Sequence, residues 1–258
     1  AAGKGVASGQ VAIGLYSQTA TTGAGNTTVG YEAGKVISSG SSHTAIGYQA
    51  LMSQTTQGGD TAVGIHALKS ALNGGYQRVA VGAYASQELT GATYTTTVGY
   101  GAGQFLTGGN NTCIGTFAGK GATGASGGWQ NTFIGYGAGI GVRAGAYNTT
   151  VGHDAGMTTT GAQHTVFLGY NAGRLNTASN VVAIGSNALA ANTTAGTIVA
   201  IGTNALASSA HSNASDNIAI GYYAMDASNG SATYGNIAIG SNALGDASHN
   251  SQNNIAIG

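Results

Sequence analysis

The sequence has no proline, a single cysteine and only 5 % charged residues. One cysteine excludes an intrachain disulfide, and the position of Cys113 between Thr112 and Ile114 favours a small buried residue over a reactive thiol. Seven basic residues balance seven acidic ones, so no basic field exists to attract nucleic acid or an anionic membrane. No apolar run reaches the ~18 residues of a membrane-spanning helix. We therefore expect no nucleic-acid partner and no direct membrane insertion.

Glycine is abundant, and its positions define an internal repeat. It accounts for 47 of the 258 residues, against a usual ~7 %. Fifteen glycines, the anchor glycines, follow an Ile, Val or Leu at intervals of 16 to 20 residues, about 17 on average. They are Gly14, Gly30, Gly47, Gly64, Gly82, Gly99, Gly115, Gly135, Gly152, Gly169, Gly185, Gly202, Gly221, Gly240 and Gly258. A repeat of this regularity predicts a solenoid.

The three residues before each anchor glycine have the pattern of a short strand. The first strand column, beginning with Val11 and Thr27, is always β-branched, and the last strand column, beginning with Ile13 and Val29, is always Ile, Val or Leu. These columns share one face of a strand, and we expect that face to point into the coil. This orientation argues against ice binding by the Thr residues, which would require them to face outward.

The middle strand column, beginning with Ala12 and Thr28, would then face outward. It carries no charge in any copy. A strand that is apolar or small on both faces is usually buried on both faces. A second copy of the chain is the simplest cover for the outer face, so we expect a homo-oligomer whose subunits pack along their length.

The residues after each anchor glycine predict a tight turn. The anchor glycine itself indicates a positive φ or a close backbone approach. Three residues later comes the Ala column, which holds Ala in thirteen of fourteen copies and Ser17 in the other, so the space there must be small. The next position, the filler column, holds either Gly or a larger apolar residue in most copies, for example Gly34 or Leu51. The remaining residues of each repeat are polar and vary in number, as expected of an outer loop.

Asparagine recurs four residues before the anchor glycine in seven of the fifteen copies, for example at Asn26, Asn111, Asn131, Asn148 and Asn254. Stacked coils would place these side chains above one another as an amide ladder. Asn is equally suited to be a turn residue that enters the strand. Both interpretations stay open at this point.

Tyrosine recurs directly after the anchor glycine. The residues are Tyr31, Tyr48, Tyr100, Tyr136, Tyr170 and Tyr222. Because neighbouring strands are ~4.8 Å apart, stacked coils would align these rings in an interrupted aromatic strip. We expect the strip either to pack between chains or to contact glycan, and aromatic enrichment at interfaces favours packing.

Several segments resemble known repeats. NIAIGYYAM (217–225) and NIAIGSNAL (236–244) resemble the YadA-like head repeat of trimeric autotransporter adhesins. NTTVGYEAG (26–34) and NTFIGYGAG (131–139) are also similar to repeats of bacteriophage tail fibres. The resemblance covers nearly the whole chain and implies a left-handed parallel β-roll that forms a trimer. The present repeat is longer than that of the adhesins, which implies longer outer loops.

Catalysis finds little support in the sequence. The acidic residues are Glu32, Asp60, Glu88, Asp154, Asp216, Asp226 and Asp246, and the histidines are His43, His66, His153, His164, His211 and His249. Neither set recurs at a fixed place in the repeat, so no metal-ligand spacing is formed. The Ile-Gly-x-x-Ala motif also resembles one hexapeptide of left-handed β-helix acyltransferases, but only one such hexapeptide occurs per repeat. We expect no enzyme, no metal and no cofactor.

Together these features predict an all-β solenoid of ~17-residue coils, a left-handed parallel β-roll in a homotrimeric rod. The array spans 1–258 in about fourteen coils and is expected to be a fragment of a longer fibre. The expected function is a structural or adhesive segment of the bacteriophage tail-fibre type, acting as a rigid shaft or host-receptor-binding region. The alternatives are the head of a bacterial trimeric autotransporter adhesin and, less favoured, an acyltransferase. The expected location is extracellular, on a virion tail fibre or a bacterial surface.

Overall fold

The computed structural model describes residues 8–19, 21–71, 75–89, 91–122, 128–141, 144–191, 196–208, 215–226, 233–245 and 252–258. This part of the chain is all-β and contains no helix. It divides into two compact units, Ala1–Gln130 and Asn131–Gly258. The strands of the first unit are β1 (Val11–Ile13), β2 (Thr27–Val29), β3 (Thr44–Ile46), β4 (Thr61–Val63), β5 (Val79–Val81), β6 (Thr96–Val98) and β7 (Thr112–Ile114). Those of the second unit are β8 (Thr132–Ile134), β9 (Thr149–Val151), β10 (Val166–Leu168), β11 (Val181–Ile184), β12 (Ile198–Ile201), β13 (Ile218–Ile220), β14 (Ile237–Ile239) and β15 (Ile255–Ile257).

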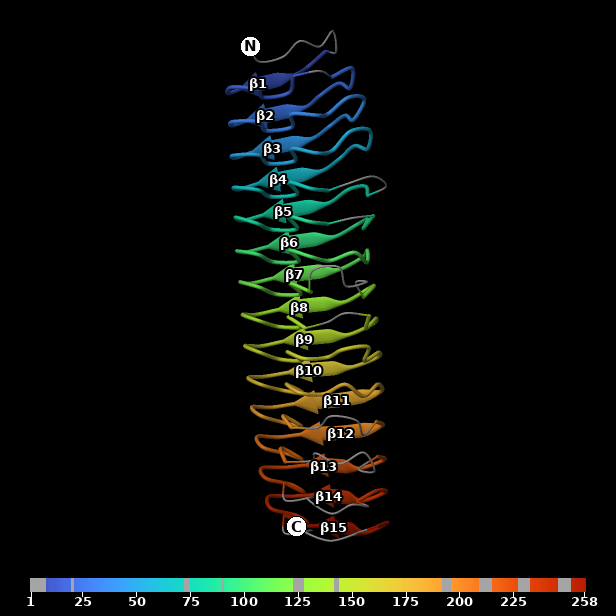
Figure 1. The fold of residues 1–258 in the computed structure, drawn as a ribbon. Helices are drawn as coiled ribbons and strands as arrows, with labels where there is room; N and C mark the ends of the chain where they lie inside the picture. The colour runs from blue at the N-terminus through green and yellow to red at the C-terminus, as the bar shows by residue number, and fades with distance from the viewer. Residues whose placement is uncertain are drawn as a thin grey trace. The chain divides into compact units, whose positions relative to one another are not determined.

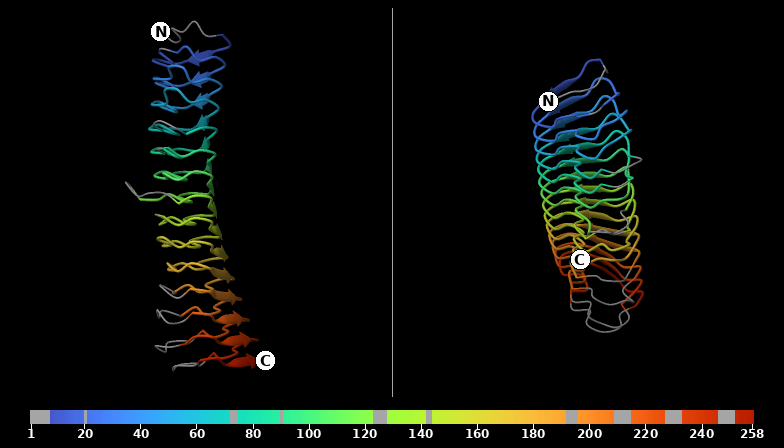
Figure 2. Two further views of the ribbon diagram at one scale, coloured as in Figure 1. Left: turned by 90° about the vertical axis from the view of Figure 1, so that its right-hand side faces the viewer. Right: turned by 45° about the horizontal axis from the view of Figure 1, so that its top comes forward.

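Within each unit, every strand pairs in parallel with the next one along the chain (Figure 1). The register places equivalent repeat residues opposite each other, as in Val11↔Thr27 and Ile237↔Ile255. The strands form one wall of the coils, and the chain returns along the other side (Figure 2). Each unit is therefore a parallel β-solenoid with coils of about 17 residues, as the repeat predicts.

The predicted orientation of the strands is wrong. The middle strand column points inward, with Ala45, Phe133 and Phe167 fully buried. The first and last strand columns point outward, and Ile114 and Leu168 are 40 % and 43 % exposed. The physical reason is the narrow interior of the coil, which already holds the Ala column and most of the filler column. One further inward side chain per coil fits there, whereas two columns of β-branched residues would not.

The interior is filled by an exchange of volume between the middle strand column and the filler column. Six copies with Ala in the strand carry a large apolar filler, in the pairs Ala45/Leu51, Ala62/Leu68, Ala183/Leu189, Ala200/Leu206, Ala219/Met225 and Ala238/Leu244, while Ala12 and Ala80 are paired with Gln18 and Ser86. Copies with a larger strand residue carry Gly, in the pairs Thr28/Gly34, Thr97/Gly103, Cys113/Gly119, Phe133/Gly139, Thr150/Gly156 and Phe167/Gly173. A Cβ at Gly139 would collide with the Phe133 ring. The two columns therefore share one volume in each coil, as close packing requires.

The anchor glycines stack on one another through their backbones. Gly99 has a φ of +129°, and a Cβ there would lie 2.7 Å from the carbonyl oxygen of Gly115 in the next coil. Gly14 has the same relation to Gly30, at 2.5 Å. Both features that the sequence predicts at this position, a positive φ and a close backbone approach, are thus present. Only glycine combines them without strain.

The asparagine column is a buried amide ladder. The side-chain oxygen of Asn131 accepts the backbone N–H of Asn148 at 2.9 Å. In β13–β15 the amides also bond directly, because the Asn254 side chain donates to Asn236 Oδ1 at 3.0 Å and that of Asn236 donates to Asn217 Oδ1 at 3.2 Å. These bonds satisfy backbone and side-chain groups that burial would otherwise leave unpaired. The ladder interpretation is therefore confirmed, at a position that leads into each strand.

Candidate functional site

The outward face of the strands, the strand face, consists of the first and last strand columns. Neither column contains a charged residue. Its most exposed apolar residues are Val11, Ile13, Ile46, Val79, Val98, Ile114, Ile134, Val166, Leu168, Ile239, Ile255 and Ile257. Threonine occupies the first strand column from Thr27 to Thr149 except at Val79, and it is absent from that column from Val166 onward. Apolar surface that recurs in every coil marks an interaction surface better than scattered exposed side chains do.

An aromatic ladder borders the strand face where the strands end. In the first unit it contains one ring from each of seven successive coils, with centroids 5.2 to 6.1 Å apart. The rings are Tyr16, Tyr31, Tyr48, His66, Tyr84, Tyr100 and Phe117. Tyr31 and Tyr48 stack face to face, 5.3 Å apart with their planes 10° from parallel.

The ladder is more continuous than the sequence prediction allows. Tyr16, His66, Tyr84 and Phe117 come two residues after the anchor glycine rather than one, and they fill coils in which the first position lacks a ring. A left-handed backbone, with φ between 57° and 61° at these residues, directs them to the same edge. The signal was present in the sequence but required both columns to be considered together.

The second unit contains a shorter ladder. The rings of Tyr136 and Tyr170 lie on either side of His153, at 4.8 and 5.5 Å. Tyr222 instead meets its neighbour Tyr223 edge-on at 4.4 Å. The six tyrosines that the sequence singles out are between 39 % and 55 % exposed in a single chain. Both interpretations, packing between chains and glycan contact, require such exposure.

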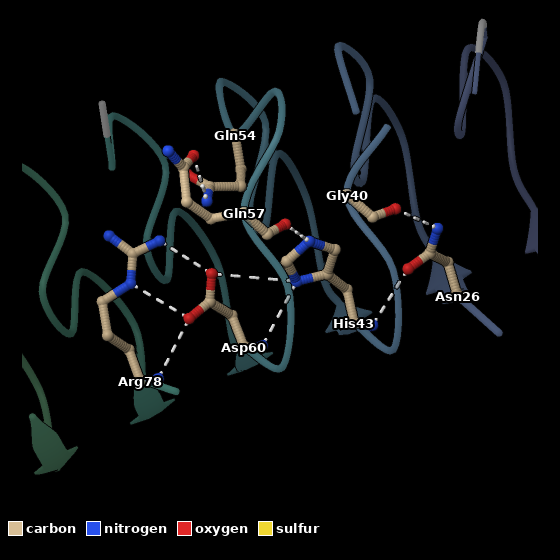
Figure 3. Close-up of polar contacts among 7 residues, drawn as sticks. All are labelled: Asn26, Gly40, His43, Gln54, Gln57, Asp60 and Arg78. Atoms are coloured by element: carbon tan, nitrogen blue, oxygen red, sulfur yellow. Dashed lines mark hydrogen bonds and ion pairs between the residues drawn. The ribbon is translucent and has the colours of Figure 1, made fainter. Parts of the chain in front are cut away.

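A buried polar cluster lies inside the first unit, in the column that holds asparagine in other coils (Figure 3). The Arg78 guanidinium donates to both carboxylate oxygens of Asp60, at 3.0 and 2.7 Å, and the Arg78 backbone N–H donates to Oδ1 at 3.0 Å. Both side chains are fully buried. Removing one partner of such a buried pair is strongly destabilising, because the other charge is left unpaired. The pair nevertheless adds little net stability compared with apolar residues at both positions. Its geometric effect is to fix adjacent coils in register.

His43 occupies the same column one coil before Asp60. Its Nδ1 accepts the backbone N–H of Asp60 at 3.2 Å, so Nε2 carries the proton and donates to the carbonyl oxygen of Gln57 at 2.6 Å. Burial lowers the pKa of His43, although the nearby Asp60 carboxylate opposes this effect. The ring is therefore neutral, and the Nδ1 atom faces the carboxylate at 3.7 Å without an ion pair.

The cluster joins residues of three different types. His43, Asp60 and Arg78 occupy the same place in three successive repeats, a grouping that the acidic residues and the histidines do not reveal when each set is considered separately. Their side chains are excluded from solvent, which leaves no access for a substrate. The arrangement is that of a structural cluster rather than a catalytic centre.

The other titratable residues do not converge on a site in the described ranges. Glu32 pairs with Lys35 at 2.6 Å and accepts a hydrogen bond from Gln49 at 2.7 Å. Cys113 is buried, and burial raises the pKa of its thiol to about 12. No group of three or more His, Cys, Asp or Glu side chains that could hold a metal occurs among the described residues. Asp246, His211 and His249 lie outside them.

No protein-family model, curated protein or solved structure matches this chain. Among the described residues, no helix has the length and apolarity needed to cross a membrane. The protein is a parallel β-solenoid with an uncharged strand face bordered by aromatic rings.

Proposed function

We propose that the chain is a structural and adhesive fibre segment of the bacteriophage tail-fibre type, in which three copies pack through their strand faces. In this arrangement each chain is a left-handed β-roll, and the trimer is a rigid extracellular shaft that holds or presents a host-receptor site. The strand face is the observation that carries the proposal.

The size of the strand face supports association along many coils rather than at one point. Fully burying a Val, Leu or Ile contributes about 1.5–3 kcal/mol, so the 40 % exposure of Ile114 corresponds to roughly 1 kcal/mol. Association costs about 4–15 kcal/mol of lost freedom. One coil cannot supply this, whereas the repeated contribution of successive coils can. The face therefore favours lengthwise packing of chains.

The oligomeric mass tests the proposal. Native mass spectrometry of the purified chain should give the mass of three copies. The charge introduced by Ile114→Glu and Leu168→Glu on the strand face should produce single chains, while Thr56→Glu, at an exposed position on the return side of a coil, should leave the mass unchanged. A wild-type chain that stays folded and monomeric on dilution would overturn the proposal.

Such a monomer would call for another function for the strand face. The threonines of the first strand column face outward, so the orientation that argues against ice binding does not hold. Thermal hysteresis in a solution of the stable monomer would indicate that the strand face binds ice. Acetyl-CoA binding, measured by calorimetry, would favour the acyltransferase alternative.

The aromatic ladder has its own test. If the ladder packs between chains, Tyr136→Ser should lower the melting temperature, because the mutation removes an aromatic contact from every subunit. If the ladder contacts glycan, stability should hold and binding to cells or glycan should fall. Attachment to bacterial cells would favour the tail-fibre proposal, and attachment to animal cells or extracellular matrix would favour the trimeric autotransporter adhesin.

A further inference from the structure

A hollow of about 610 Å³ lies on the outside of the first unit, where the chain leads into strands β3–β6. Its lining includes Ser42, Gly59, Tyr76, Gln77 and Tyr94. Two large aromatic side chains stand beside small residues there. Tyr76 is 50 % exposed and Tyr94 is 57 % exposed, so both side chains are accessible to solvent.

The hollow arises from a change of residue size between successive coils. The coils of β3 and β4 carry serine and glycine at this corner, and the coils of β5 and β6 carry the two tyrosines. Gly58 cannot be larger, because a Cβ there would lie 2.6 Å from the carbonyl oxygen of Ser41. The backbone N–H of Tyr94 donates to the carbonyl oxygen of Tyr76 at 3.0 Å, which fixes the spacing of the two tyrosines.

The floor of the hollow is braced by the buried polar cluster. Gly59 and Gln77 directly precede Asp60 and Arg78 in the chain. The backbone N–H of Arg78 and its guanidinium both bond to the Asp60 carboxylate, so the two coils are held together immediately beneath the lining. A site of this kind is formed before a ligand arrives, which reduces the entropy cost of binding.

The lining selects a class of ligand. None of its residues is charged, which favours neither an anion nor a cation. The hydroxyl groups of Ser41 and Ser42 and the side-chain amide of Gln77 can both donate and accept hydrogen bonds. Tyr76 and Tyr94 offer aromatic faces for an apolar surface. A neutral hexose combines these features, because its rim carries hydroxyl groups and its ring faces carry C–H groups.

We propose that this hollow binds a neutral hexose unit of a surface glycan, with Tyr76 and Tyr94 stacking on the sugar and Ser42 and Gln77 bonding its hydroxyl groups. The inference rests on the proposed adhesive function and gives it a receptor class. It assigns that role to residues other than the aromatic ladder, which remains available for contacts between chains.

The test uses an array of neutral hexose oligosaccharides, including maltohexaose, cellohexaose and mannohexaose, with sialylated and sulfated oligosaccharides beside them. Calorimetry then measures affinity for the neutral oligosaccharide that binds best. Tyr76→Ala and Tyr94→Ala should each weaken binding roughly tenfold through loss of stacking. Tyr94→Phe should retain most of the affinity because its ring remains.

Tyr147→Ala is the matched control. Tyr147 occupies the repeat position of Tyr94 in the second unit, is 52 % exposed and stacks on His164 at 4.9 Å. Its removal should leave affinity unchanged. Melting temperatures of all the variants should agree, since each change is on the surface.

Several results would overturn the inference. These are an array without neutral binders, binding restricted to charged glycans, and an affinity that falls equally in Tyr147→Ala or remains in Tyr94→Ala. Native mass spectrometry of the same samples distinguishes failure of this inference from failure of the proposed function. Oligosaccharide binding by a monomeric chain would support the hexose site and overturn the proposed trimeric fibre. A trimer that binds no oligosaccharide would support the fibre and overturn the hexose site.

Discussion

The exchange of volume between the middle strand column and the filler column predicts that one damaging mutation should rescue another. Phe133 is fully buried, and a Cβ at Gly139 would collide with its ring. We consider Phe133→Ala, Gly139→Leu and the two changes together. The double variant would carry the Ala and Leu pair that the β3 coil holds as Ala45 and Leu51.

The expected energies follow from packing. Phe133→Ala leaves a cavity and should cost about 4 kcal/mol of unfolding free energy. Gly139→Leu overpacks the coil and places leucine at a φ of +61°, for about 3 kcal/mol in total. Leu51 and Leu68 already adopt φ values of 51° and 49°, so the fold tolerates leucine in this conformation. The double variant should therefore cost about 2 kcal/mol, where independent effects would add to about 7 kcal/mol.

Equilibrium unfolding at a fixed protein concentration measures the coupling, because association would otherwise change the apparent stability. Hydrogen exchange in β8 shows whether the effect is local. The control combines Gly139→Leu with Ile134→Ala, since Ile134 is adjacent in sequence but faces outward, 36 % exposed. That control should be additive. A Phe133→Ala/Gly139→Leu variant as unstable as the sum of its single changes would refute the shared-volume account.

Further predictions concern the backbone stack and the buried groups. Gly99→Ala should cost more than about 2 kcal/mol and lower the melting temperature, because φ is +129° and the next coil leaves no room for a Cβ. Asp60→Asn should cost about 3–5 kcal/mol by leaving Arg78 buried without its counter-charge, whereas valine at both positions should cost less in the same unfolding assay. Because the pKa of His43 is lowered from 6.5, its stabilising contribution is complete above that pH and is lost as the pH falls through the folded-state pKa. His43→Asn should remove that part of the dependence of melting temperature on pH. Cys113, with a pKa of about 12, should react with a thiol reagent at pH 8 only after unfolding.

Much of the coil is predictable because its constraints are local and recur in every copy. Gly99 follows a strand, has a positive φ and lies close to the backbone of the next coil. Because every coil imposes the same constraints, a glycine occurs at this position in every repeat. The Ala column, which includes Ala50, holds a small residue in every copy because it is buried in a narrow interior. The Asn131 ladder follows from the same stacking. Repetition therefore reveals the coil even where each copy taken alone resembles a loop.

The orientation of the strand could not be derived from strand periodicity. The strand has only three residues, Thr132, Phe133 and Ile134, and none is charged. Thr132 does not mark the outside, because threonine also occurs in the buried middle column, for example at Thr28. Large apolar residues at Ile134 and its equivalents suggest a core, but they lie on the outward strand face, where Ile134 is 36 % exposed. The decisive signal is the pairing of Phe133 with Gly139, which requires comparison of columns six residues apart.

The buried cluster and the hollow depend on the identity of neighbours in adjacent coils. Asp60 and Arg78 are 18 residues apart in the sequence. Their pairing can be predicted only if the residues four before each anchor glycine are compared between adjacent repeats, including those that are not Asn. The hollow further requires knowledge that Ser42, Gly59 and Tyr94, from three different coils, line the same corner. Neither feature changes the pattern of the repeat, so neither is visible in a consensus.

The coil separates the residues that build it from those that determine what it contacts. At the corner before the strand, Ser42, Gln77, Tyr94 and Tyr147 have φ values between 51° and 61°. The backbone therefore holds a serine, a glutamine or a tyrosine in the same conformation. The Ala column is fully buried in all four of these coils, whichever residue stands at the corner. Binding surfaces can then vary from coil to coil without any change in the core, and the step from small residues to Tyr94 is one such variation.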